Sequence, residues 1–328
     1  MKYRSNRLLA CAVLGALTCM VPITGHAAEK YPSRPIRILV GYAAGGVNDL
    51  VARAIAPRLS TRLGQQVVVE NRPGAGGNIA TELVAQAAPD GYTMLLGSVA
   101  SLAMSPALLG KVPFDPLRDF APITKAADVS SLIAAHPTLP ARNLKEFVAL
   151  AKKHPGKLNY ASPGTGSISH LSMELFKKAA GIDVVHVPYK GGAPASMDAV
   201  AGQVECLVSI ISSGAPHVKA GKLRGLAVTT PKRAAILPDV PAVAEMGYPG
   251  FSATGWLGLL FPAHTPQEIV NRVYRDAVAV INMPEVKRQF EMNGLEAEAS
   301  DPKSFSEYIK AEHDRWAKVI QDAGIKVK

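Results

Sequence analysis

Short apolar runs alternate with helix-length amphipathic segments along the whole chain. Continuous apolar runs are typical of strands that are buried on both faces, and apolar residues that recur every three or four positions indicate helices. This alternation predicts an α/β protein whose sheets are mostly parallel and flanked by helices. The expected strands are 36–40, 66–70, 93–97, 131–135, 157–161, 184–187, 204–210 and 223–229; the expected helices are 50–63, 79–88, 144–154, 169–180, 193–201 and 214–220.

The pattern restarts at two points, near residues 119–131 and 248–258, where a segment with Pro or Gly leads into an extended apolar run. We interpret these points as two crossings between two lobes. The first lobe would contain residues 28–128 and 252–328, and the second lobe residues 129–251. Helical segments at 266–279 and 302–321, with Pro near their starts, should pack back onto the first lobe.

Two segments combine a strand, a glycine turn and the start of a helix: Ile38–Asp49 and Leu158–His170. The first amides of a helix lack partners within the helix, and that end of the helix carries partial positive charge. Glycines let a ligand approach the backbone closely, so both turns are suited to binding an anion. The pair predicts one ligand that is held from two sides, beyond the strand ends where such sheets bind ligands.

The candidate ligand contacts are small polar residues and glycines in these two turns, together with side chains next to them. Tyr42 leads into the first turn, where its ring could line the pocket or fill the core. Asp49 is expected to cap the helix, because a carboxylate next to an anionic ligand would be repulsive; Asn48 is the alternative cap. His170, in the first turn of its helix, is expected to be structural. The proposed ligand contacts are Tyr42, Gly45, Gly46, Asn48, Ser98, Ser101, Ser162, Thr165, Gly166, Ser167 and Ser209.

Residues 1–27 have the pattern of a secretory signal. Three basic residues precede an almost wholly apolar segment at 8–23, and small residues occupy positions 25 and 27. We expect cleavage after Ala27 or Ala28 and export to the periplasm. Pro22 interrupts the apolar segment, so a retained membrane anchor is not expected, and no other stretch approaches that length.

The charge distribution and the cysteine content bear on the expected partners and on disulfide formation. The net charge of +10 falls to about +7 without the three basic residues of the signal, and the remaining basic residues are spread along the chain. No basic run is interleaved with aromatic residues, which excludes nucleic acid as the expected partner. Cys206 would be the only cysteine after cleavage, so no disulfide can form within one chain. We expect a monomer.

Known catalytic and metal-binding patterns are missing from the sequence. There is no Gly-x-Gly-x-x-Gly at the first glycine turn, no Tyr-x-x-x-Lys pair and no Gly-x-Ser-x-Gly. Histidines and cysteines lack the spacing of a metal site, and Cys206 lies in an apolar strand where a thiol is inert. A binding protein without cofactor or metal is therefore expected. The alternative from another functional class is an exported enzyme that acts on a small acid.

Eight motifs occur in order along essentially the whole mature chain: Tyr31–Arg37, Val68–Asn78, Ala88–Tyr92, Phe114–Phe120, Val185–Gly192, Ala220–Val228, Leu237–Glu245 and Gly255–Leu259. Together they resemble the Bug (TctC-like) family, the periplasmic solute-binding proteins of tripartite tricarboxylate transporters. The resemblance implies a two-lobed periplasmic binding protein (Venus flytrap) fold. It also implies that a small aliphatic or aromatic mono- or dicarboxylate is captured and delivered to a two-component membrane permease. A sensing module that presents its closed form to a receptor is the alternative.

The family's two ligand loops match this chain at many positions but not at all of them. Gly41 and Ala44 stand where similar proteins have prolines, and Leu102 and Ser105 where they have His and Asn. Similar proteins commonly have Asp at the position of Ser209, and that difference favours a plain or aromatic carboxylate over an amino acid. The matching positions are Tyr42, Gly45, Gly46 and Asp49 in the first loop, and Ser162, Gly164, Thr165, Gly166, Ser167 and His170 in the second.

Overall fold

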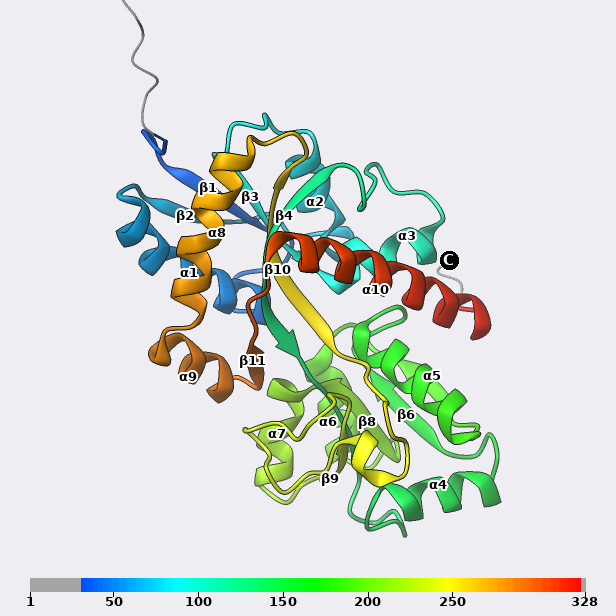
Figure 1. Ribbon diagram of the computed structural model, residues 1–328. Coiled ribbons are helices and arrows are strands. Elements are labelled where there is room, and N and C mark those ends of the chain that lie inside the picture. Colours follow the sequence, from blue (N-terminus) through cyan, green and yellow to red (C-terminus); the bar gives the residue numbers. More distant parts are fainter. Residues whose placement is uncertain (1–30, 326–328) are drawn as a thin grey trace, which may run out of the picture.

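The computed structural model describes residues 31–325, which fold into two lobes that each contain one sheet (Figure 1). The predicted signal segment and its cleavage site lie outside the described residues. Within residues 31–325, no helix is both long enough and apolar enough to cross a membrane.

The first lobe contains a six-stranded sheet in the order β11-β4-β10-β3-β1-β2. β1 pairs in parallel with β2 and β3, whereas β10 runs antiparallel to β3 and β4, and β11 antiparallel to β4. The strands are β1 (Ile36–Val40), β2 (Val67–Asn71), β3 (Thr93–Ser98), β4 (Phe120–Val129), β10 (Gly255–Pro262) and β11 (Leu295–Ala297).

The second lobe contains a five-stranded sheet in the order β7-β6-β8-β5-β9. β6 pairs in parallel with β7 and β8, and β5 runs antiparallel to β8 and β9. The strands are β5 (Ser131–Ala135), β6 (Asn159–Ser162), β7 (Val185–Pro188), β8 (Cys206–Ile210) and β9 (Arg224–Val228).

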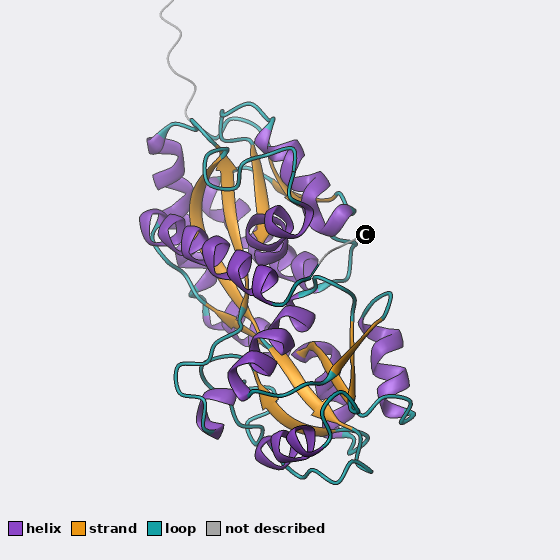
Figure 2. Ribbon diagram, turned by 90° about the vertical axis from the view of Figure 1, so that its right-hand side faces the viewer, coloured by secondary structure: helices purple, strands orange, loops and turns teal. Residues whose placement is uncertain are grey.

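Helices flank both sheets, which confirms the predicted two-lobed α/β fold (Figure 2). Most strands of each sheet run in the same direction, as predicted. The exceptions are β10 and β11 in the first sheet and β5 in the second, which run antiparallel to their neighbours and make both sheets mixed. The helices of the first lobe are α1 (Val47–Leu63), α2 (Asn78–Ala85), α3 (Ser105–Leu109), α8 (Gln267–Ile281), α9 (Pro284–Met292) and α10 (Pro302–Asp322). Those of the second lobe are α4 (Leu144–Lys153), α5 (Ile168–Ala180), α6 (Gly192–Val200) and α7 (Ile211–Lys219); shorter turns are η1 (Ala75–Gly77), η2 (Ala100–Met104) and η3 (Val243–Met246).

Alternate residues of each buried strand enter different cores, as the pleat of a strand requires. Ile38 and Val40 of β1 join a cluster with α1 and α8, whereas Leu39 joins the cluster on the opposite face of the sheet. That second cluster also contains Phe305 of α10 and continues into the other lobe, where it includes Phe176 of α5. One face of each sheet therefore shares a continuous core.

Two strands lead from one lobe to the other. β4 ends at Val129 and β5 begins in the second sheet two residues later, while β10 returns the chain to the first sheet and pairs with β4 from Gly255 onward (Figure 1). The lobe boundaries 28–128, 129–251 and 252–328 stay a prediction.

Candidate functional site

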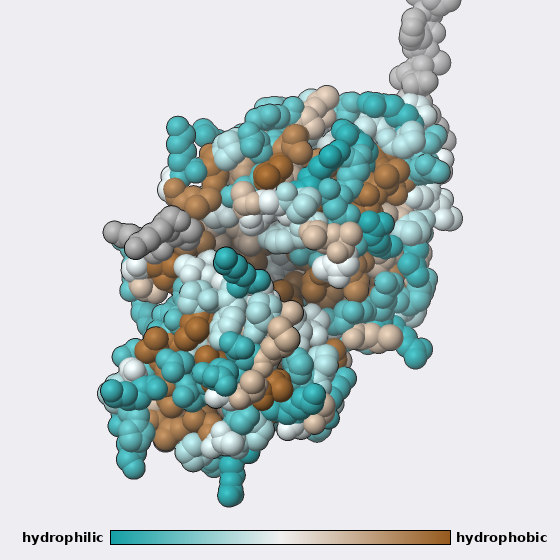
Figure 3. Space-filling view, turned by 180° about the vertical axis from the view of Figure 1, so that it is seen from behind, coloured by the Kyte–Doolittle hydropathy of each residue, from teal (hydrophilic) through white to brown (hydrophobic). Residues whose placement is uncertain are grey.

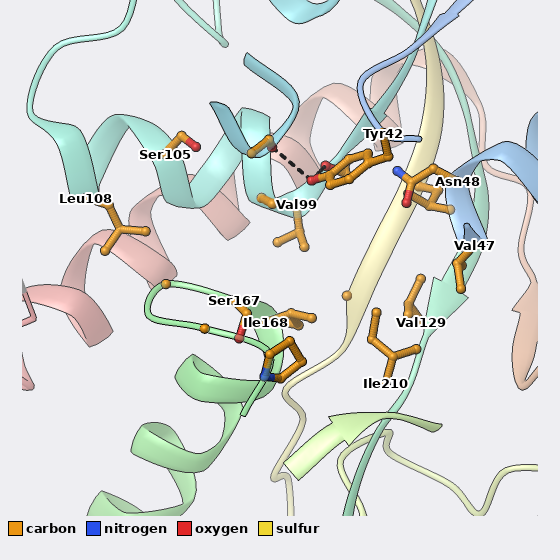
Figure 4. Close-up of a pocket in the computed structure, with 18 of the residues that line it drawn as sticks. Tyr42, Val47, Asn48, Val99, Ser105, Leu108, Val129, Ser167, Ile168 and Ile210 are labelled. Carbon is orange, nitrogen blue, oxygen red and sulfur yellow. Dashed lines mark hydrogen bonds between the residues drawn. The ribbon is translucent and has the colours of Figure 1, made fainter. Parts of the chain in front are cut away.

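A cavity of about 540 Å³ lies between the lobes (Figure 4). From behind, the surface is hollowed between the upper and lower bodies of the molecule (Figure 3). No Asp, Glu, Lys, Arg or His is among the residues that line the cavity. The lining residues are Tyr42, Val47, Asn48, Ala75, Gly76, Ser98, Val99, Ala100, Ser105, Leu108, Leu109, Val129, Pro163, Gly164, Thr165, Gly166, Ser167, Ile168, Ile210, Gly255, Trp256 and Leu257.

The first glycine loop leads from β1 into α1. The helix begins at Val47 with Gly46 as its N-cap residue, and no side chain caps it. Our prediction that Asn48 or Asp49 caps this helix was therefore wrong. The Asp49 carboxylate instead accepts a hydrogen bond from Gly45 N (2.9 Å), because a residue in the first turn can reach back to the loop that precedes it.

Asp49 is buried and holds the first loop in place. Its carboxylate also accepts hydrogen bonds from Arg53 Nε (2.9 Å) and Asn71 Nδ2 (2.9 Å). Burial acts to raise the pKa of Asp49, but the hydrogen bonds from Arg53, Gly45 and Asn71 prevail and lower it. Asp49 therefore remains ionised, and its hydrogen-bonding partners belong to the protein itself.

Two predicted contacts in the first loop line the cavity and two do not. Tyr42 lines it and donates a hydrogen bond from its hydroxyl to Gly76 O (2.9 Å). The amide nitrogen of Asn48 is buried and has no hydrogen-bond partner among the described residues. Gly45 and Gly46 are exposed and lie outside the lining, so their role is to shape the loop.

The second glycine loop leads from β6 into α5. Ser167 is the N-cap residue, and its side chain accepts a hydrogen bond from His170 N (3.2 Å). Gly164 and Gly166 have positive φ angles of 144° and 78°, which residues other than glycine rarely adopt. His170 Nδ1 accepts a hydrogen bond from Gly166 N (3.0 Å). Thr165, Gly166 and Ser167 all line the cavity, and their contact with a ligand stays a prediction.

Beneath the second loop, three rings form a stack. The His170 and His186 rings lie 3.8 Å apart and nearly parallel, and the Tyr160 ring lies 4.9 Å from His186 on its other side. Burial disfavours the charged form and lowers the pKa of both histidines to about 4. A neutral His170 can accept the bond from Gly166, which supports its predicted structural role.

Ser162 supports this loop from below. It is fully buried outside the cavity lining, and its hydroxyl accepts a hydrogen bond from Gly164 N (3.2 Å) and lies 2.7 Å from His186 Nε2. The structure therefore places it behind the loop instead of facing the cavity.

Ser101 and Ser209, two further predicted contacts, also lie outside the lining, as does Leu102. Ser101 is buried next to Ser98, which does line the cavity, and Leu102 is fully buried in the core. Ser209 is fully buried, and its hydroxyl donates to Ile210 O (3.3 Å). Side chains of consecutive strand residues point to opposite faces, so Ile210 reaches the cavity and Ser209 does not.

Sequence reasoning missed most of the apolar lining. These residues come from the first turns of α1 and α5, from α3, and from β4, β8 and β10: Val47, Ile168, Leu108, Leu109, Val129, Ile210 and Leu257. Val47 and Ile168 directly follow the glycine loops in the sequence, and this position could have indicated that they line the cavity. No comparable sequence feature marked Leu108 and Leu109 of α3 as lining residues.

Other reactive groups do not add a second site. Cys206 in β8 is completely buried, and burial raises the pKa of its thiol far above its usual range. Within residues 31–325, no cluster of His, Cys, Asp and Glu could hold a metal ion.

Comparison with known proteins identifies the family. A family model described as tripartite tricarboxylate transporter family receptor (TctC) matches residues 51–325. Protein BugT of Bordetella pertussis is 35% identical over 325 residues, which cover 98% of this chain and 99% of BugT. This confirms the resemblance drawn from the sequence motifs.

Two solved structures show the same fold. An R. palustris protein solved with adipate is 35% identical, with a TM-score of 0.79 over 90% of this chain and 99% of that one. The periplasmic binding protein BugD is 34% identical, with a TM-score of 0.75 over 91% of this chain and 100% of BugD. The chain belongs to the TctC family, whose members are receptors and not enzymes.

Proposed function

We propose that this protein is a periplasmic receptor that captures a small carboxylate between its lobes and delivers it to a two-component membrane permease. The observation that carries the proposal is an uncharged cavity bordered by two glycine loops, each of which leads into a helix N-terminus. The adipate bound to the R. palustris protein supports a carboxylate as the ligand.

Neutral donors would hold the carboxylate. Among the described residues Thr165 N donates no hydrogen bond, so this amide is available, whereas Gly166 N donates to His170 Nδ1. The positive ends of α1 and α5 favour an anion nearby. Hydrogen bonds to a charged group contribute about 1.5–3 kcal/mol each, so a few donors suffice without an arginine.

Closure of the two lobes would enclose the ligand. A Cβ placed on Gly166 would lie 2.8 Å from Leu108 Cδ1, so α3 of the first lobe lies directly against the second glycine loop. A ligand that contacts both loops favours the closed state by its greater affinity for it. We place the lobes at 28–128 with 252–328, and at 129–251.

Calorimetry with the purified protein tests the anion site. We expect a carboxylate ligand to bind at least ~100-fold more tightly than its methyl ester, which corresponds to about 2.7 kcal/mol. Equal affinities for acid and ester would contradict carboxylate capture. Uptake of the same ligand by cells that lack the protein would test delivery: unchanged uptake would contradict the transport role.

Export is a separate part of the proposal. We expect the mature chain to begin near Ala28 or Glu29, after removal of the signal segment. Intact-mass measurement of the protein from a periplasmic extract checks this. A mass that includes residues 1–27 would contradict it.

A further inference from the structure

A buried lysine and two carboxyl groups lie together where β4 leaves the first lobe. Lys125 Nζ lies 2.7 Å from Asp128 Oδ1 and 3.0 Å from Glu298 Oε2. Lys125 and Asp128 belong to β4, and Glu298 directly follows the neighbouring strand β11. The side chains of Lys125 and Asp128 are only 6% and 14% exposed, so water compensates little of their charge. We call these three residues the lysine triad.

The two carboxyl groups of the lysine triad also form a hydrogen bond with each other. Ionised carboxylates only accept hydrogen bonds and repel one another, so this contact requires a proton on one of them. Burial, together with the hydrogen bond to Glu298, raises the pKa of Asp128 to about 8, although Lys125 opposes the change. The hydrogen bond from Asp128 lowers the pKa of Glu298. The proton therefore belongs to Asp128: with it the triad is neutral, and without it the triad carries one negative charge.

The titratable groups that α10 places against the lysine triad have roles of their own. Glu312 is buried, which raises its pKa, and it accepts hydrogen bonds from Trp316 Nε1 (2.9 Å) and Arg315 Nη2 (3.2 Å). The ring of Tyr308 lies 4.4 Å from Lys125 Nζ, and burial raises the pKa of Tyr308 far above its usual range. Tyr308 is therefore a neutral ring beneath the lysine, and the oxygens of Glu312 are used by other donors.

On the strands next to β4, one further acid lies close to the lysine triad. Glu296 of β11 is the register partner of Asp128 and is exposed. Partial desolvation and the Glu298 carboxylate raise the pKa of Glu296, and Glu291 and Lys232 are other charged groups close to it. Within residues 31–325, Glu296 forms no ion pair. β10, on the other side of β4, has no charged residue. Glu296 is thus a neighbour of the triad and not a member.

The lysine triad is adjacent to the ligand cavity and to both crossings. Asp128 directly precedes Val129, which lines the cavity, and its register partner on β10 is Trp256, which also lines it. α10 packs across β4 (Figure 1), and its Arg315 donates a hydrogen bond to Ser252 O in the second crossing (2.9 Å). Charges interact strongly across a protein interior, so an anion in the cavity experiences the charge of the triad.

We propose that the lysine triad is a proton-binding site that links carboxylate binding in the cavity to pH. Loss of the shared proton adds a negative charge that repels an anionic ligand. The bound anion in turn strengthens the binding of the proton, because such coupling is reciprocal. A unit charge at roughly 10 Å, with an effective dielectric constant of about 20, changes an affinity on the order of 10-fold. This inference rests on the proposed carboxylate capture.

Calorimetric titration with adipate at several pH values between about 6.5 and 9 tests the linkage. Both carboxylates of adipate are ionised throughout this range, so the ligand itself does not titrate. We expect the wild-type affinity to fall by ~10-fold as pH rises through the pKa of Asp128, about 8. Adipate binding that is independent of pH would overturn the linkage and leave carboxylate capture intact. Failure of adipate to bind at every pH would count against carboxylate capture itself.

Variants of the two carboxyl groups distinguish this site from other titrating groups. Asp128→Asn and Glu298→Gln each leave Lys125 paired with a single carboxylate, so neither variant has a proton to share. Adipate affinity should then be independent of pH in both. Glu296→Gln is the matched control, because it removes a neighbouring acid and retains the lysine triad, and it should keep the wild-type decrease. A decrease that persists in both triad variants would place the proton elsewhere and overturn the proposal.

Carbon-13 NMR of the side-chain carboxyl groups tests the shared proton without any ligand. Comparison with the Asp128→Asn spectrum assigns the Asp128 signal, which should titrate near pH 8 and not near its ordinary value of 3.8. Titration of both triad carboxyls below pH ~5 would overturn the proposal whatever the result with adipate. Circular dichroism melts confirm that each variant is folded. Glu298→Gln covers the case in which Asp128→Asn does not fold, because the Glu298 side chain is 52% exposed.

Discussion

Individual residues of the two glycine loops divide into those that face the cavity and those that hold the loop. Asp49 and His170 belong to the second group: each accepts a hydrogen bond from a glycine amide of its own loop. Tyr42 and Thr165 belong to the first. Asp49 and His170 can therefore act on a ligand only through the loop backbone that they position.

Replacing Asp49 by Asn tests this positioning role. The amide would lose the charge that Arg53 pairs with, and its nitrogen would face either Gly45 N or Asn71 Nδ2, both of which need an acceptor. We expect the free energy of unfolding to fall by about 1–3 kcal/mol in urea denaturation. Asp314→Asn is the control, because its pair with Lys310 is exposed and contributes about 0–1 kcal/mol. Equal effects of the two substitutions would argue against a special role for Asp49.

The buried histidines predict a dependence of stability on pH. The pKa of His170 is about 4 in the folded protein, compared with an ordinary value of 6.5. As pH falls from about 6.5 to 4, the unfolded chain takes up a proton that the folded chain does not, so the free energy of unfolding decreases. For His170 this loss is up to about 3 kcal/mol.

His170→Gln should reduce that loss, because Gln does not titrate and its side-chain oxygen can still accept from Gly166 N. Urea denaturation at several pH values between 4 and 7 measures the effect. His154→Gln is the matched control, because it also removes one histidine but His154 is exposed. Profiles of His170→Gln and wild type that run parallel would contradict the prediction.

Among the residues, the sequence predicted loop positions better than the direction of side chains. Thr165, Gly166 and Ser167 line the cavity because a glycine turn at a strand–helix junction exposes its backbone and small side chains, even though Ser167 also caps the helix. Ser209 was misplaced, since a shift of one residue in a strand turns the side chain to the other face. Apolar lining residues such as Ile210 cannot be distinguished from core residues by pattern alone.

At the level of elements, strands bounded by glycine or polar turns were predicted closely. β1 and β5 have the predicted bounds, and α5 begins one residue before its expected start. The sequence analysis predicted the segments of β4 and β10 only as crossings between the lobes and did not predict that they form long strands of the first sheet. Their antiparallel pairing depends on residues far apart in the chain, which local periodicity does not report.

The tight contact between α3 and the second loop gives a prediction at this scale. In Gly166→Ala the new methyl group meets Leu108 Cδ1 at 2.8 Å, and the φ of 78° is unfavourable for Ala. We expect the loop to shift and ligand affinity to fall by at least ~10-fold in calorimetry. An unchanged affinity would exclude the loop from the site.

Gly181→Ala provides the matched control for this substitution. Gly181 ends α5 with a φ of 62°, and a methyl group added there would have no atom within 4 Å. Gly181→Ala therefore has the conformational cost of a positive φ, about 1 kcal/mol, but creates no contact with α3. Its stability should decrease in urea denaturation while its ligand affinity remains that of the wild type.

Over the whole molecule, the two lobes are joined by more than the two crossing strands. One core cluster continues between them, and Ser172 Oγ and Arg315 Nη1 donate hydrogen bonds to Ala253 O and Ser252 O in the second crossing. Lys178 of α5 also pairs with Asp322 of α10. Movement between the lobes is thus expected as hinge rotation about these connections and not as free separation.

Ligand-driven closure predicts a measurable change in shape. A ligand that contacts both glycine loops binds the closed state more tightly and shifts the population toward it, so the radius of gyration from small-angle X-ray scattering should decrease at saturation. Gly166→Ala, measured at the same ligand concentration, should show a smaller decrease because fewer molecules are occupied. Gly181→Ala should behave like the wild type. If calorimetry shows full occupancy while the scattering curve of the wild type is unchanged, the cavity is filled without closure, and the hinge has no part in binding.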